Sequence, residues 1–243
     1  SWPFRLADLE NWQAATERVE KLIREKVERF PHCEYIDVFH ESFDNVLPPE
    51  LHGDAYVAKQ PERESKLFEL GVKGARFLRE KFPHLKLVVG NSGGSAGTIA
   101  MLLRHGFPRD LIDYLGSETT GQTIAPEKLS IHTTAGIWIL KETARTFGYD
   151  IPLTGCYEFT CRAERDLSPQ LQAEWYTRDM LYGLAHRFPT ISPGEIEDVG
   201  NAYYDSFYGA AGICQRRGLH YPKPAYVAMA TLTKVLDSVK LVR

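Results

Sequence analysis

The feature that most constrains the fold is a regular alternation of helix-like and strand-like segments along the whole chain. In residues 8–30, apolar residues recur every three or four positions beside charged ones, which is the pattern of an amphipathic helix. The same reading predicts helices over 8–30, 61–82, a segment through Met101–Arg104, 130–147, 169–187 and 224–236. Short apolar runs between them predict five strands: Tyr35–His40, Leu85–Val89, Leu111–Gly116, Ile151–Glu158 and Asn201–Tyr208.

This alternation predicts a parallel sheet. No tight-turn signal of the Asn-Gly type separates neighbouring strands, so each connection runs through a helix. Parallel strands joined in this way use right-handed crossovers and form an α/β fold, either an open sheet or a TIM-type barrel. In both architectures functional side chains gather at the carboxyl ends of the strands.

Composition limits the classes of partner. The chain has 243 residues, 43% of them hydrophobic and 25% charged, which predicts one domain with a substantial core. A net charge of -3 without a clustered basic face argues against nucleic acid. The longest apolar runs are far shorter than the roughly 20 residues that cross a bilayer, so we expect no membrane span. Four cysteines without a C-x-x-C pair do not form a disulfide framework or a zinc ribbon.

Acidic residues follow three of the predicted strands. Glu41 and Glu118 come just after a strand, and Glu158 is the last residue of one. A loop or helix-capping role accounts for any one of these carboxylates alone, but three in the same position point to a shared site. Two carboxylates facing each other can cleave a glycosidic bond, because one protonates the leaving oxygen while the other attacks or activates water. Both Glu41 and Glu158 have aromatic neighbours and suit this chemistry.

Three stretches together resemble retaining glycoside hydrolases of clan A. They are YIDVFHES, ending in Glu41, LTGCYEF, containing Glu158, and the closing segment YPKPAYVAMATLTKVLD. Members of that clan are (β/α)₈ barrels with the acid/base glutamate after the fourth strand and the nucleophile after the seventh. Three strand steps separate Glu41 from Glu158 here, as the resemblance requires. It implies that Glu41 is the acid/base and Glu158 the nucleophile, with carboxyls about 5 to 5.5 Å apart.

The resemblance also implies further site residues and an unusual domain organisation. We expect substrate contacts from His40, Asn91, Glu118, Tyr157 and Tyr204; His40 stands where the family usually has asparagine. Only five strands are predicted, corresponding to strands four to eight. We therefore expect residues 1–243 to form a single barrel-type catalytic domain that is N-terminally incomplete.

The partners follow from the same reading. The substrate is a carbohydrate, and a partner chain or a missing N-terminal segment would complete the barrel. We expect no cofactor and no metal. The family resemblance slightly favours a secreted or periplasmic location. A non-catalytic carbohydrate-binding barrel remnant is the competing class, because strands are missing.

The stretch Gly90-Asn91-Ser92-Gly93-Gly94 offers a different enzyme class. It fits G-x-S-x-G, the turn that exposes the serine nucleophile of α/β-hydrolases. Asp205 with His220, or Glu158 with His186, would complete a triad. No HGGG-type oxyanion segment lies upstream, so the motif alone is a weak signal.

A metal site from His40, Glu41 and Glu118 is a further alternative, since imidazole and carboxylate suit zinc or manganese. Adjacent residues on a strand point to opposite faces, so His40 and Glu41 bind one ion only if the strand has ended. Cys156 and Cys161 flank Glu158, where a free thiol on each is favoured over a local disulfide.

Overall fold

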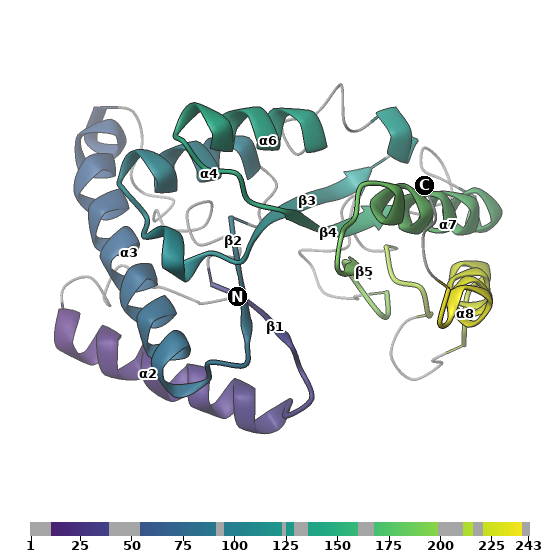
Figure 1. Cartoon of the computed structure of the whole chain (residues 1–243), viewed down its shortest axis with the longest axis horizontal. Helices are drawn as coiled ribbons and strands as arrows, with labels where there is room; N and C mark the ends of the chain where they lie inside the picture. The colour runs from purple at the N-terminus through teal and green to yellow at the C-terminus, as the bar shows by residue number, and fades with distance from the viewer. Residues whose placement is uncertain are drawn as a thin grey trace. The chain divides into compact units, whose positions relative to one another are not determined.

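The computed structural model describes residues 11–38, 54–90, 95–122, 125–128, 136–159, 168–198, 211–215 and 221–239. Their strands form one sheet in the order β1-β2-β3-β4-β5 (Figure 1). The strands are β1 Tyr35–Asp37, β2 Lys86–Val89, β3 Tyr114–Gln122, β4 Leu153–Phe159 and β5 Ile191–Pro193. Doubly wound sheets reverse their strand order at a switch point, whereas this order follows the chain. The architecture is that of a partial TIM-type (β/α) barrel, which confirms the predicted fold class.

The described helices separate the strands as the alternation predicts. They are α2 Trp12–Arg29, α3 Asp54–Lys81, α4 Ser95–Arg104, α6 Ile137–Thr146, α7 Pro169–Ala185 and α8 Pro224–Leu236, with a 3₁₀ turn η1 at Arg109–Leu111. The predicted bounds of α8 match those observed. Helix α3 begins seven residues before Pro61, which lies inside the helix rather than at its start. The first part of the helix predicted over 130–147 lies outside the described residues, and α6 covers the rest.

One strand prediction needs correction, and one observed strand was not predicted. Strand β3 begins at Tyr114 and continues to Gln122, so Glu118 lies within the strand rather than after it. The polar residues that continue β3 carry no apolar signal, which is why the sequence reading ended the strand early. Among the described residues, the strand after α7 is β5, Ile191–Pro193, a stretch of three residues that was not predicted as a strand. The strand predicted over Asn201–Tyr208 lies outside the described residues.

The chain divides into two compact units, each with its own core. The first contains Ser1–Gly116 and Leu140–Pro152, and the second contains Ser117–Ile139 and Leu153–Arg243, so β3 passes from one to the other. In the first unit β1 pairs with β2, and β2 with β3, in parallel, with Asp37 opposite Val88 and Val88 opposite Tyr114. In the second unit β4 pairs in parallel with β5, with Tyr157 opposite Pro193.

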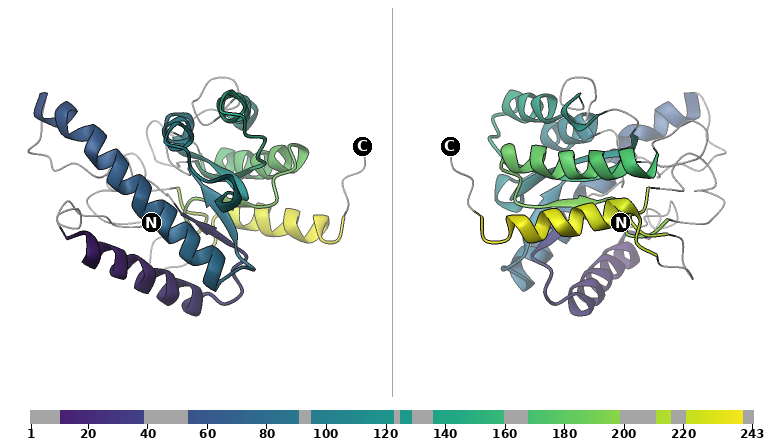
Figure 2. Two further views of the ribbon diagram at one scale, coloured as in Figure 1. Left: turned by 60° about the vertical axis from the view of Figure 1, so that its left-hand side comes forward. Right: turned by 90° about the vertical axis from the view of Figure 1, so that its right-hand side faces the viewer.

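The first unit is built around helices α2 and α3, which lie side by side (Figures 1 and 2). Asn11 caps α2 by accepting a hydrogen bond from Ala14 N at 3.2 Å. Ala15, Val19 and Ile23 recur every four residues of α2 and are buried, so one stripe of the helix faces the core. Gly74 of α3 lies opposite this stripe, where a Cβ would be 3.4 Å from Val19 Cγ1.

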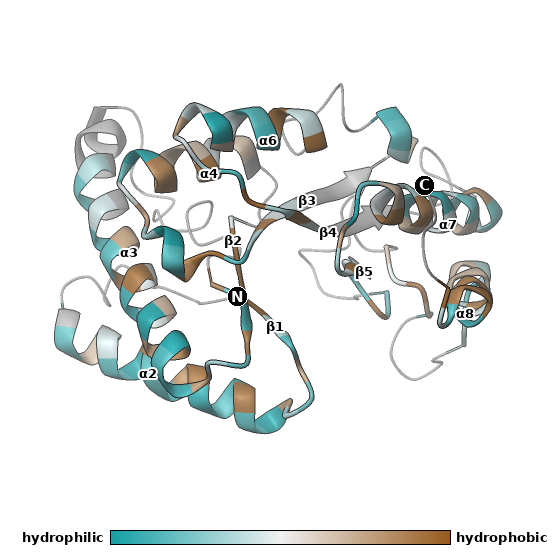
Figure 3. Ribbon diagram, viewed as in Figure 1, coloured by the Kyte–Doolittle hydropathy of each residue, from teal (hydrophilic) through white to brown (hydrophobic). Residues whose placement is uncertain are grey.

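The second unit packs α7 against β4, β5 and α8. Ser168 caps α7 by accepting from Leu171 N at 3.1 Å, and Pro169 starts the helix. Gly183 allows Ile191 of β5 to pack directly against α7, since a Cβ there would overlap the Ile191 side chain. Helices α7 and α8 run side by side (Figure 2). Helix α8 is largely hydrophobic (Figure 3), although Ala225 is its one buried residue.

Candidate functional site

The structure describes three of the seven predicted site residues, as strand positions. Glu118 is the fifth residue of β3, and Tyr157 and Glu158 are the fifth and sixth of the seven residues of β4. His40, Glu41, Asn91 and Tyr204 lie outside the described residues, as does Ser92 of the G-x-S-x-G stretch. Glu158 is therefore next to the carboxyl end of its strand, where the alternation predicts a functional residue.

In the first unit, the described ends of β1 and β2 lie at one edge of the sheet. Val38 N donates to Val88 O at 2.9 Å, so β1 continues its pairing with β2 one residue past Asp37. His40 and Glu41 follow Val38 by two and three residues. Asn91 follows β2 and Gly90 directly. Because adjacent parallel strands end at the same edge of a sheet, Val38 and Gly90, the last described residues before Glu41 and Asn91 in the sequence, lie at the same edge.

Gly90 determines how the chain leaves β2. Its φ is +87°, a conformation that favours glycine, and a Cβ at this position would be 2.7 Å from Ile99 Cγ1. Sterics therefore require a glycine at position 90, the first residue of the predicted glycine-rich turn. The close approach of α4 to the end of β2 therefore fixes the position of Gly90, the residue that precedes Asn91 in the sequence.

Tyrosines from β1 and β3 meet at the opposite end of the strands. The ring centroids of Tyr35 and Tyr114, the first residues of their strands, are 5.7 Å apart. Burial, the neighbouring Tyr114 and Glu34, and a hydrogen bond with Tyr114 raise the pKa of Tyr35. Because both residues lie at the amino ends of their strands, this pair is not at the carboxyl-end edge where the site is predicted.

A buried acid on α7 was missed by the sequence reading. Asp179 is 3% exposed, and burial together with the negative charge of Glu127 raises its pKa to about 8. Burial also raises the pKa of Glu127, but the hydrogen bonds and charge of Arg178 outweigh it and the net pKa is lowered. The spacing of Gln172, Tyr176, Asp179 and Gly183 follows one face of a helix and could have revealed Asp179 as buried.

The alternatives are weakly supported by the described residues. His186 follows α7 as its C-cap and packs against Tyr182, with ring centroids 4.5 Å apart and planes tilted by 60°, while Asp205 and His220 lie outside the described residues. Among the residues that the structure describes, no group of three His, Cys, Asp or Glu side chains could hold a metal ion. Within the same residues, no helix has the length and apolar character needed to cross a membrane.

Comparison with solved structures finds glycoside hydrolases. Xylanase 10B from Thermotoga petrophila RKU-1 is 16% identical with a TM-score of 0.53, and the match covers 94% of this chain and 67% of the xylanase. Xylanase A of P fluorescens subsp. cellulosa, solved with xylopentaose, is 15% identical with a TM-score of 0.53, covering 96% of this chain and 72% of that one.

A family 39 glycoside hydrolase from Bacteroides cellulosilyticus WH2 also matches, at 18% identity and a TM-score of 0.49. That match covers 71% of this chain, which spans only 37% of the hydrolase. No protein-family model matches the sequence, and no curated protein matches it. The two xylanases thus show a shared fold, which confirms the predicted structural resemblance.

Proposed function

We propose that this chain carries the catalytic glutamates of a retaining glycoside hydrolase. Glu158 attacks the anomeric carbon, and Glu41 protonates the leaving oxygen. Glu41 then deprotonates the water that hydrolyses the glycosyl-enzyme intermediate. His40, Asn91, Glu118, Tyr157 and Tyr204 are the proposed substrate contacts. The substrate is a carbohydrate with a glycosidic bond.

The position of Glu158 is the observation that carries the proposal. It is the penultimate residue of β4, in a sheet whose strands follow the chain order without reversal. In a barrel with this order, residues at the carboxyl ends of strands are the ones that reach substrate. Glu41 follows β1, three strands earlier in the same order, which is the spacing that the resemblance to clan A implies.

The same strand order counts against the serine hydrolase. A nucleophile elbow needs a strand, a sharp turn and a helix, and β2, Gly90 and α4 supply that sequence of elements. However, strands in chain order and a fold shared with xylanases match a barrel rather than a doubly wound sheet. The close contact with Ile99 is also enough to explain why position 90 is a glycine, without a catalytic role for the turn.

Hydrolysis of aryl glycosides tests the proposal directly. We expect the full chain to release nitrophenol from at least one nitrophenyl glycoside of a panel, and Glu158→Gln to abolish the release. A 2-fluoro glycoside is expected to label Glu158, detected as a mass shift of the peptide that contains it. Binding of oligosaccharide without turnover or labelling would instead support a non-catalytic barrel remnant. Labelling of Ser92 by a fluorophosphonate would support the serine hydrolase.

A further inference from the structure

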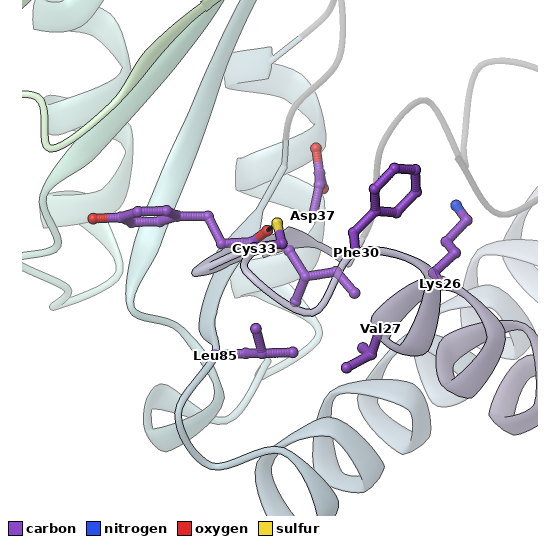
Figure 4. A pocket seen from close by; sticks show the side chains of 8 residues that line it. Lys26, Val27, Phe30, Cys33, Asp37 and Leu85 are labelled. Carbon is purple, nitrogen blue, oxygen red and sulfur yellow. Dashed lines mark hydrogen bonds between the residues drawn. The ribbon is translucent and has the colours of Figure 1, made fainter.

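A cavity in the first unit lies toward the amino ends of the strands. It has a volume of about 210 Å³ and is enclosed by the last turns of α2 and by Tyr35, Ile36 and Asp37 of β1 (Figure 4). Cys33, which precedes β1, and Leu85, which precedes β2, also line it. Substrates of barrel enzymes bind at the carboxyl ends of the strands, so a binding residue is better sought in a connection that follows a strand.

The connection from β5 to α8, in the second unit, contains a ladder of three short backbone segments. They are residues 196–198, 211–215 and 221–223. Asp198 N donates to Cys214 O at 3.0 Å on one side of the middle segment, and Lys223 N donates to Ile213 O at 2.9 Å on its other side. The first segment follows β5 and the third leads into α8. The ladder is therefore part of a strand-to-helix connection, the kind that forms the substrate-binding face of a barrel.

Two close contacts hold this ladder in place. A Cβ at Gly212 would overlap Asp198 N, so the first segment packs directly on the backbone of the middle one. Tyr176 OH of α7 donates to Ala211 O at 2.8 Å, and both residues are buried. The ladder is therefore fixed to α7 and provides a preformed support for the side chains on it.

Asp198 and Lys223 form an ion pair across the ladder, from its two outer segments. Lys223 Nζ donates to Asp198 Oδ1 at 3.0 Å. The lysine side chain is 8% exposed and the aspartate side chain 18%, so a ligand from solvent reaches the carboxylate more easily than the ammonium group. Within the described part of the chain, this carboxylate accepts no second hydrogen bond, although an ionised carboxylate has room for about four.

This ion pair is poorly placed to serve stability alone. Lys223 is the N-cap of α8, where the positive end of the helix dipole disfavours a cation. Buried ion pairs also add little net stability, because desolvation of the two charges offsets their attraction, and apolar residues of similar size stabilise a fold as well. Fixing the direction of a carboxylate that a ligand contacts is a task that apolar residues cannot perform.

The register of β4 and β5 places this connection beside the strand end that carries Glu158. Tyr157 of β4 is opposite Pro193, the last residue of β5. Glu158 follows Tyr157, and residues 194–198 follow Pro193. Since the two strands are parallel, Glu158 and the first segment of the ladder both follow the carboxyl edge of the same strand pair.

The charges of the connection favour a neutral ligand. Glu195 and Glu197 lie in the same stretch as Asp198, so acidic side chains outnumber the single ammonium group of Lys223 in residues 194–198 and 221–223. An anionic sugar would be repelled by this excess of carboxylates. A sugar hydroxyl is neutral and donates a hydrogen bond, which is what a carboxylate accepts.

From these features we propose that Asp198 binds a hydroxyl group of the carbohydrate substrate and that Lys223 is the residue that positions its carboxylate. The hydroxyl donates to Asp198 Oδ2 while Lys223 Nζ holds Oδ1. The inference rests on the proposed function and adds a specificity residue to it. A sugar that lacks this hydroxyl leaves the carboxylate without its ligand hydrogen bond and is therefore a poorer substrate.

Deoxy substrates test the contact with the full chain. The probes are the nitrophenyl glycoside that the chain hydrolyses fastest and a set of analogues that each lack one hydroxyl. Asp198→Asn turns an amide NH₂ toward the ligand, because Lys223 keeps the amide oxygen, and should lower kcat/KM for the parent glycoside about tenfold. For one analogue the same substitution should change kcat/KM less than twofold, since the contact is already absent. Asp237→Asn, at the exposed C-cap of α8, is the matched control and should affect no substrate.

Lys223→Met tests the positioning role. Methionine keeps an apolar side chain of similar length but removes the ammonium group that fixes the carboxylate. We expect kcat/KM to fall for the parent glycoside and to change little for the same analogue that is insensitive to Asp198→Asn. A merely structural role would lower kcat/KM for all substrates alike. Circular dichroism verifies folding, and Asp198→Asn, which keeps an acceptor for Lys223, provides the test if Lys223→Met does not fold.

The contact and the proposed hydrolase activity can fail separately. If no glycoside is hydrolysed, titration calorimetry with cellotetraose, xylotetraose and mannotetraose measures the contact as binding, which Asp198→Asn should weaken about tenfold. That result would contradict the catalytic proposal alone. The inference about Asp198 is overturned if Asp198→Asn leaves kinetics and binding unchanged, if it impairs the parent glycoside and every analogue equally, or if the chain shows neither hydrolysis nor saturable binding of any tetrasaccharide.

Discussion

Gly90 and Ile99 are in such close contact that no side chain fits between them. A Cβ at position 90 would be 2.7 Å from Ile99 Cγ1, and the φ of Gly90 is +87°. The contact holds the end of β2 close to α4. Their packing therefore contributes to the stability of the first unit.

Gly90→Ala should destabilise the protein by about 2–4 kcal/mol, because backbone strain and overpacking add. Gly106→Ala is the matched control: its φ is +76°, but no atom lies within 4 Å of the added Cβ. We expect a cost of only about 1 kcal/mol there, from the backbone alone. Urea denaturation measures both. Equal losses for the two variants would show that the contact with Ile99 is unimportant.

Asp113 connects three elements of the first unit. Its Oδ2 accepts from Arg79 Nη2 of α3 at 2.9 Å and from Leu87 N of β2 at 2.8 Å, just before β3 begins. Both side chains of the ion pair are about a quarter exposed. Asp113→Ala should lower the free energy of unfolding by about 2–3 kcal/mol, and Asp113→Asn by less, since asparagine keeps an acceptor for Leu87 N.

The exposed pair of Arg145 and Glu142 on α6 provides the comparison for Asp113. Its nitrogen and oxygen are 2.7 Å apart, but both side chains are about half exposed. Glu142→Ala should therefore change stability by no more than about 0.5 kcal/mol. If Asp113→Ala were equally mild, the joint between α3, β2 and β3 would not depend on this carboxylate.

Most of the fold was predictable because local signals and tertiary packing agree. The buried stripe of α2 follows from the spacing of its apolar residues, and β2 and β4 contain short apolar runs. Both patterns can be recognised in the sequence alone. Strand β5 was not predictable, because its pairing depends on Gly155 and on Gly183 of α7, which are distant in sequence. The full length of β3 was missed for a related reason: the polar residues Ser117–Gln122 extend as part of a sheet, without an apolar pattern of their own.

The candidate site was only partly predictable. Strand alternation placed Glu158 next to the end of β4, as observed. It misplaced Glu118, whose neighbours in sequence do not reveal that the strand continues past it. The roles of Glu41 and Glu158 stay predictions, since they rest on how two distant carboxylates meet.

Azide rescue distinguishes the proposed roles of the two glutamates. With an activated dinitrophenyl glycoside, Glu41→Ala should form the glycosyl-enzyme and then stall, and azide should accelerate its release with retained configuration. Glu158→Ala should react with azide only in a single displacement, which gives the inverted glycosyl azide. NMR of the products reads the configuration. Retained product from Glu158→Ala would exclude it as the nucleophile.

The raised pKa of Asp179 predicts that the free energy of unfolding falls as pH rises. A surface carboxylate with a lowered pKa has the opposite effect. Its pKa is about 8 in the folded protein, against 3.8 for a free side chain. Between these values the folded state holds a proton that the unfolded state has lost. The free energy of unfolding therefore falls as pH rises from about 4 to 8, by up to about 1.4 kcal/mol per pH unit from this group.

Asp179→Asn should remove this slope, because asparagine does not titrate. Denaturant unfolding at a series of pH values should show a variant that gains stability over the original protein from pH 4 upward, with the gain levelling off above pH 8. Glu127→Gln removes the negative charge that helps to raise the pKa of Asp179. In that variant the same fall in stability should end at a lower pH. A constant difference between Asp179→Asn and the original protein across this range would mean that Asp179 is ionised in the folded state, despite its burial.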